Sequence, residues 1–248
     1  IFKDIINIMT NILDDFQIRT ELNQKFWDDE QLKPKVHTRL LKIALDFLKE
    51  LEIESGLEDI TFTGSLANYN YSRHSDIDLH MILDFNEIDE NEELVREYLL
   101  AKKSLWNDMH QIKIKGAEVE VYFENIGDPH HSTGIYSVLN NEWIKKPEPS
   151  SPETLIDFYA VTQKADDLVK QINDVILSPM DDSKLQRIET LKAKIKRMRK
   201  CGLETGGEYS VENLAFKVLR NEGHIKNLWD ESVKTHDYSM SLESNIKK

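Results

Sequence analysis

Apolar and polar residues alternate in three stretches of the first half of the chain. Ile60 and Phe62 alternate with threonines up to Gly64, and a second alternating run follows over residues 77–83. The stretch IKIKGAEVEVYFEN, at residues 112–125, holds two further runs around Gly116. A period of two is the pattern of a strand with one buried face. The sequence therefore predicts three strand regions, the third as a hairpin or a bent strand.

Other stretches repeat their apolar residues every three or four positions, as an amphipathic helix does. Residues 1–55 predict two such helices, the second beginning near Lys35. Its apolar side carries Val36, Leu40, Ile43, Phe47 and Leu51. A further helix is predicted from about Glu92 to Met109. After residue 147 the pattern is wholly helical.

Start and stop signals divide this helical half. A serine, a proline and an early acid at residues 151–153 predict the start of a helix that ends near Leu177. Ser178 and Pro179 repeat the signal for a helix over residues 184–200, which the glycines at 202, 206 and 207 are expected to break. A last helix is predicted from about Val211 to Glu231.

These elements predict an α+β protein in three parts. Residues 1–55 hold N-terminal helices that pack on the core. Residues 56–147 form the core, a mixed sheet with flanking helices that closes with a tight hairpin at Asn140 and Asn141. Residues 148–248 form a helical C-terminal domain.

The candidate chemistry lies between the first two strands, in TGSLANYNYSRHSDIDLH. Gly64 and Ser65 form a turn suited to gripping phosphate, and Asp76 and Asp78 follow at the start of the next strand. Successive strand side chains alternate faces, so the two aspartates point the same way. Two unit charges about 4 Å apart repel by roughly 4 kcal/mol at an effective dielectric near 20. Carboxylates this close are tolerated with a cation or a raised pKa, and oxygen-only ligands suit Mg²⁺ or Mn²⁺.

A third acid is expected from the stretch around Gly116. Val119 and Val121 lie on one face of that strand, and Glu118 and Glu120 lie on the other. A two-ion site usually needs one more ligand than the aspartate pair supplies. Glu120, between the two valines, is the predicted third ligand, and Glu118 is the alternative.

Taken in this order, the residues resemble the DNA polymerase β-like nucleotidyltransferase superfamily, over roughly residues 36–125. The resemblance implies that Gly64 and Ser65 hold the β- and γ-phosphates of a nucleoside triphosphate. It implies that Asp76 and Asp78 bridge two Mg²⁺ or Mn²⁺ ions and that Glu120 binds the ion that activates the acceptor hydroxyl. Many relatives carry Asp at this third position, where this chain has Glu.

A fuller resemblance links the chain to predicted nucleotidyltransferases of large tailed phages. It rests on TGSLANYNYSRHSDIDLH, PHHSTGIYSVLNNEWIKKP and YSVENLAFKVLRNEGHIKNLWD. It implies a cytoplasmic enzyme, in the host cytoplasm if phage-encoded, and no particular acceptor. RNA 3′ ends, a second nucleotide, a protein hydroxyl and a small molecule all stay open as acceptors.

Charge is distributed unevenly along the chain. The formal net charge is −13, yet residues 184–200 hold eight basic residues and one acid. Three interpretations stay open for this helix: a solvated face, a triphosphate contact, or contact with a nucleic-acid backbone. Lys196 and Lys200 are the predicted nucleotide contacts there, together with Arg73, which precedes the aspartate pair.

The remaining composition narrows the class of protein. A single cysteine, Cys201, excludes an intramolecular disulfide framework, and no apolar run reaches the length of a membrane span. Four aromatic residues that could stack on a base are interpreted as packing residues: Tyr69, Tyr71, Tyr136 and Trp143. His130 and His131 are interpreted as loop residues rather than metal ligands. The competing hypothesis is a non-catalytic nucleotide- or RNA-binding regulatory module on the same fold, and the oligomeric state stays open.

Overall fold

The computed structural model describes residues 16–17, 19–53, 56–130, 132–149, 156–181 and 183–241. These residues form two compact units, one within residues 15–152 and one made of the helices that follow. The predicted first helix, the predicted start signal at residues 151–153 and His131 lie outside the described residues. Each unit is described by itself.

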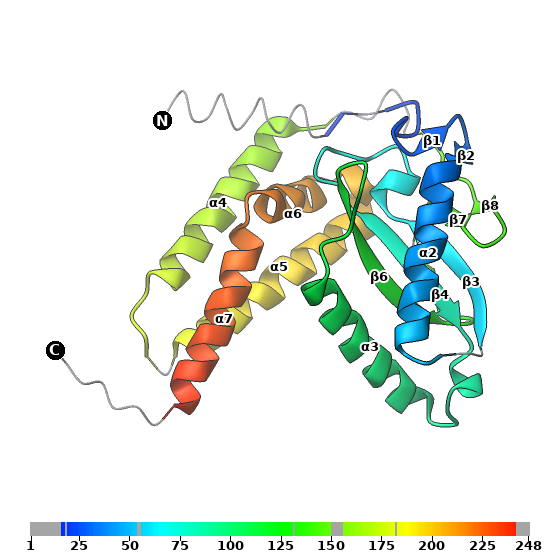
Figure 1. Cartoon of the computed structure of the whole chain (residues 1–248). Coiled ribbons are helices and arrows are strands. Elements are labelled where there is room, and N and C mark those ends of the chain that lie inside the picture. Colours follow the sequence, from blue (N-terminus) through cyan, green and yellow to red (C-terminus); the bar gives the residue numbers. More distant parts are fainter. Residues whose placement is uncertain are drawn as a thin grey trace. The chain divides into compact units, whose positions relative to one another are not determined.

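Six strands form one mixed sheet in the order β5-β6-β4-β3-β7-β8 (Figure 1). The strands are β3 (Leu57–Thr63), β4 (Ile77–Leu83), β5 (Lys113–Ile114), β6 (Ala117–Asn125), β7 (Ile135–Ser137) and β8 (Glu142–Lys145). The neighbours β4 and β6 are parallel, and all other neighbours are antiparallel. Together with six helices among the described residues, this confirms a mixed α+β protein.

The hairpins form where the sequence supplies residues that accept a positive φ. Lys115 and Gly116, at φ 54° and 94°, join β5 to β6, so the third strand region is a hairpin. Asn141, at φ 57°, lies in the turn between β7 and β8, as the asparagine pair predicted.

The two faces of the sheet differ in burial. Ile77, Leu79, Met81 and Leu83 of β4 are fully buried, whereas the side chains between them are half-buried. We call the second face the open face; it carries Asp78 and His80 from β4, and Glu120, Tyr122 and Glu124 from β6.

Two helices pack on the apolar face, α2 (Pro34–Glu50) and α3 (Glu92–Met109). Phe47 of α2 meets Trp106 of α3 with ring centroids 4.4 Å apart. The Asn107 side chain donates to the Val121 carbonyl at 3.1 Å and accepts from its N–H at 3.0 Å. Because β5 is too short to pair with this part of β6, Asn107 satisfies the backbone hydrogen-bonding groups of Val121 instead.

A small hairpin, β1 (Trp27–Asp28) with β2 (Gln31–Leu32), packs beside the sheet. Trp27 stacks on Phe62 at 5.6 Å and on Trp143 at 4.8 Å, and it meets Tyr136 edge-on at 5.0 Å. Tyr136 and Trp143 are therefore packing residues, as predicted.

The second unit consists of α4 (Phe158–Ile176), α5 (Lys184–Gly206), α6 (Val211–Asn221) and α7 (His224–Met240). The predicted break of α5 is confirmed at Gly206 and Gly207, where the helix ends, but not at Gly202. Gly202 stays within the helix and packs tightly against Glu212, where a Cβ would not fit. The prediction of a single last helix was wrong. The predicted last helix is two helices, because Gly223 turns left-handed at φ 80° between them.

An ion pair is buried inside this helical unit. The Lys184 ammonium lies 2.6 Å from the Glu231 carboxylate and also donates to the carbonyls of Ile176 and Ser178. The Lys184 side chain is only 3% exposed. Among the described helices, none is long and apolar enough to cross a membrane.

Candidate active site

The glycine turn is formed where β3 ends. Gly64, at φ 77° and ψ −166°, leads into the single 3₁₀ turn η1 (Ser65–Ala67). Ala67 N–H donates to the Gly64 carbonyl, and Asn68 N–H donates to the Ser65 carbonyl, both at 3.2 Å. This combination of φ and ψ is essentially restricted to glycine.

A serine joins the glycine turn to the start of the next strand. Ser65 Oγ donates to Ser75 Oγ at 2.7 Å, and Ser75 Oγ also accepts from the Ser72 N–H at 2.9 Å. Ser75 immediately precedes Asp76. Ser75 thus holds both ends of the loop together, a role that no sequence pattern predicted.

Gly64 and Asp78 are in close contact across β3 and β4. Thr63 is the register partner of Asp78, and a Cβ added to Gly64 would lie 1.8 Å from Asp78 Oδ2. The carboxylate therefore occupies the space that any side chain at position 64 would fill. Two of the predicted residues are brought together by this contact.

The parallel pairing of β4 and β6 brings in the third acid. Asp78 is the register partner of Glu120, and both lie on the open face. Glu118 pairs with Lys113 at 2.9 Å instead, and its side chain is 57% exposed at the sheet edge. The geometry favours Glu120 over Glu118 as the companion of the aspartates.

Tyr122 lies within electrostatic range of the three predicted acids. Its hydroxyl donates to Glu120 Oε2. Burial raises the pKa of Tyr122 far above its usual range, and the hydrogen bond to Glu120 and the charges of Glu120, Asp78 and Asp76 raise it further. One phenol is thus within electrostatic reach of all three acids.

The oxygen-only donor set fits a hard divalent cation. Gly64 leaves the space in which Asp78 lies, and register places Glu120 beside it. No group of three or more His, Cys, Asp or Glu side chains within the described ranges is close enough to hold a metal ion as it stands. A cation would have to draw the carboxylates together, so the metal site stays a prediction.

The predicted cationic contacts come from two different parts of the chain. Arg73 is exposed in the loop before the aspartates, and its Nε donates to His74 Nε2 at 3.0 Å. Lys196 and Lys200 are exposed on α5, in the helical unit. Nucleotide contact by these three residues stays a prediction.

Part of the basic helix α5 packs within the helical unit. The Arg199 guanidinium lies over the Phe216 ring at 4.4 Å, and burial lowers its pKa. Lys192 lies 2.8 Å from Glu189 and 4.9 Å from the Trp229 ring centroid. Packing within the unit therefore engages part of the positive charge.

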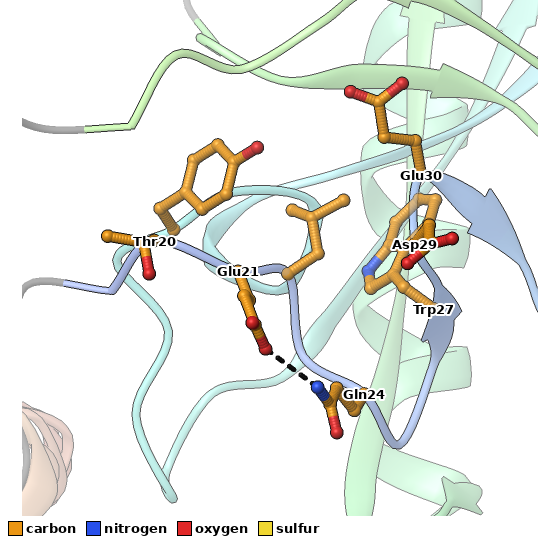
Figure 2. A pocket seen from close by; sticks show the side chains of 8 residues that line it. Thr20, Glu21, Gln24, Trp27, Asp29 and Glu30 are labelled. Carbon is orange, nitrogen blue, oxygen red and sulfur yellow. Dashed lines mark hydrogen bonds between the residues drawn. The ribbon is translucent and has the colours of Figure 1, made fainter.

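A cavity of about 250 Å³ lies beside the small hairpin of β1 and β2 (Figure 2). Its lining is mainly polar and acidic: Thr20, Glu21, Leu22, Gln24, Trp27, Asp29, Glu30 and Tyr69. Trp27 Nε1 donates to the Leu66 carbonyl at 2.7 Å, which ties this wall to η1. Glu21 accepts from Gln24 at 2.7 Å, as the dashed line in Figure 2 shows.

A second cavity, of about 230 Å³, adjoins the third acid. It is lined by Asn107, Asp108, His110, Gln111, Ile112, Glu118, Val119 and Glu120. The first cavity is thus linked to η1 through Trp27, and the second is lined directly by Glu120 of β6.

Comparison with known proteins adds little to this geometry. No protein-family profile matches the chain, and no curated protein matches it. Among solved structures, the chain is similar to the CdnE cyclic dinucleotide synthase of Elizabethkingia meningoseptica, solved with GTP and Apcpp. The alignment covers 84% of each chain at 14% identity with a TM-score of 0.23. A TM-score this low does not establish a common fold, so the function of the site is inferred from its own residues.

Proposed function

We propose that the chain is a metal-dependent nucleotidyltransferase of the polymerase β-like class. It transfers a nucleoside monophosphate from a nucleoside triphosphate to an acceptor hydroxyl and releases pyrophosphate. The observation that carries the proposal is the row of Gly64, Asp78 and Glu120 across three adjacent strands of the open face. A phosphate-binding turn beside paired carboxylates is what this reaction requires.

Each residue has a defined part in the reaction. The Ser65 hydroxyl and the backbone of the glycine turn bind the terminal phosphates. Asp76, Asp78 and Glu120 hold Mg²⁺ or Mn²⁺, which when bound stabilises charge on the phosphate oxygens and lowers the pKa of a coordinated hydroxyl. The acceptor oxygen bonds to the α-phosphorus as the bond to the bridging oxygen breaks. Pyrophosphate leaves, and the hydroxyl proton passes to solvent.

From the strand order we place the two substrates on opposite sides of Asp78. The glycine turn on β3 marks the donor side, and Glu120 on β6 marks the acceptor side. The cavity beside Glu120 also carries Asp108, whereas the charge of the lining Glu118 is paired with Lys113. Because this lining is negative, it favours a neutral or cationic hydroxyl compound over the phosphate backbone of an RNA end.

The decisive experiment follows the label. The protein is incubated with Mg²⁺ or Mn²⁺ and each α-labelled nucleoside triphosphate, alone, with RNA, and with neutral or amine-bearing alcohols. We expect label in an adduct and release of pyrophosphate. Triphosphate binding without any turnover would support the non-catalytic binding module instead.

Carboxylate variants provide the controls. Asp76→Asn combined with Asp78→Asn should abolish turnover with the fold retained or slightly stabilised, because two like charges are removed. Glu120→Gln should lose turnover and keep triphosphate binding. Glu118→Gln is the matched control, since it removes a carboxylate two residues away, and most of its activity should remain. Unchanged pyrophosphate release by the double aspartate variant would overturn the assignment.

A further inference from the structure

Tyr122 lies between the proposed metal ligands and the rest of the open face. Its hydroxyl donates to Oε2 of Glu120, and among the described residues none donates to Oε1. A carboxylate held through one oxygen keeps the other available for a cation.

The ring that carries this hydroxyl is itself held by two neighbours. The imidazole of His80, its register partner on β4, stacks on it with centroids 4.7 Å apart and planes 17° apart. The Lys103 ammonium, from α3, lies 4.1 Å from the centroid of the Tyr122 ring. A cation at this distance is attracted to the ring face. The position of the hydroxyl is therefore constrained from β4 and from α3.

His80 is held in turn by an acid and a second histidine. His80 Nδ1 lies 2.7 Å from Glu124 Oε1, and His130 Nε2 lies 2.9 Å from Glu124 Oε2. Burial tends to raise the pKa of Glu124, but the hydrogen bond and the charges of the two histidines outweigh it and lower that pKa. One continuous line of contacts thus runs from the loop at His130 along the open face to Glu120.

From these contacts we infer that Tyr122 is a positioning residue that orients the Glu120 carboxylate for the metal, with Lys103 and His80 holding its ring. The inference rests on the proposed function. A tyrosine that only packs would affect stability, whereas a positioning tyrosine should also affect the affinity for the metal. Hydrogen-bonding residues behind metal ligands commonly contribute about 10- to 100-fold to affinity or activity.

The test measures Mn²⁺ binding to the full chain by electron paramagnetic resonance, before any turnover assay. Tyr122→Phe keeps the ring and removes the hydroxyl, and it should weaken Mn²⁺ binding by about 10- to 100-fold. In turnover, the KM for Mn²⁺ should rise by a similar factor while kcat at saturating Mn²⁺ recovers. Lys103→Met, which leaves the hydroxyl in place, should cause a smaller loss in the same direction.

Tyr98→Phe is the matched control. Tyr98 also lies under a lysine, with Lys102 Nζ 5.5 Å from its ring centroid. Unlike Tyr122, it is exposed on α3, and its hydroxyl does not donate to Glu120. Its Mn²⁺ affinity should stay at the wild-type value. Melting curves of all variants separate loss of metal from loss of fold.

Asp78→Asn distinguishes failure of the positioning role from failure of the proposed function. If it abolishes Mn²⁺ binding while Tyr122→Phe binds as the wild type does, the positioning role is refuted and the metal site stands. If neither change alters Mn²⁺ binding, the proposed function fails together with the inference.

Discussion

Replacing Gly64 by alanine tests the contact on which the site depends. At φ 77° and ψ −166° a side chain is strained, which costs about 1–3 kcal/mol in the free energy of unfolding. The new Cβ would also lie 1.8 Å from Asp78 Oδ2 and 2.8 Å from its Cγ. The Asp78 carboxylate must therefore leave its place, so we expect both lower stability and loss of turnover.

Two further variants separate strain from collision. Gly207 has nearly the same backbone conformation, φ 67° and ψ −158°, with nothing within 4 Å of an added Cβ. Gly207→Ala should cost the strain of about 1–3 kcal/mol alone. Truncating Asp78 to alanine removes the colliding carboxylate, so Gly64→Ala should cost less in that background than in the wild type.

The assay is urea denaturation of the four variants of the Gly64–Asp78 cycle, with Gly207→Ala alongside. A coupling free energy of about 0.5–3 kcal/mol is expected for residues in contact. Equal costs of Gly64→Ala in both backgrounds would refute the close approach. Retained turnover by Gly64→Ala would show that the carboxylate at 78 need not lie against the glycine.

Other predictions concern the helical unit. Glu231→Gln should destabilise it by about 3–5 kcal/mol in chemical denaturation, because it leaves the buried Lys184 charge uncompensated; replacing both partners by apolar residues should cost much less. Burial tends to raise the pKa of Glu231, but Lys184 outweighs it and the pKa is lowered, so this stability is present above about pH 4.5 and is lost as the pH falls further. Glu231→Gln should abolish that acid dependence in pH-resolved melting. Neutralising the exposed Lys196 and Lys200 should leave the stability of the unit unchanged. A raised KM for the triphosphate would indicate that these lysines contact the donor, and weaker RNA binding would indicate that they contact an RNA backbone. If neither quantity changes, this part of the helix is a solvated face.

Local patterns predicted the elements because the burial of one face of a strand or helix determines which positions are apolar. The alternation in residues 77–83 determined that Asp78 and the buried leucines point to opposite faces, and that interpretation is confirmed by the burial of Leu79 and Leu83. Turn chemistry at Gly116 and Asn141 likewise determined where the hairpins close. These features depend on a few neighbouring residues, so they can be predicted without knowing the fold.

Helix ends in the second unit were harder to predict. Gly202 lies within α5, whereas Gly223 divides the predicted last helix. The neighbouring residues in the sequence did not distinguish these two outcomes. The difference is tertiary, since Gly202 is needed where Glu212 packs closely. Lys184, read as one charge of a basic helix, is instead buried against Glu231.

The candidate site shows the same division. Sequence order and alternation by themselves determined that the chain carries a glycine turn, an aspartate pair and a third acid on one kind of face. Only the tertiary structure decided that β4 and β6 pair in parallel with Asp78 opposite Glu120, and that Tyr122 lies against the third acid. Register and pairing between strands are set by long-range packing, which one strand's own pattern does not encode.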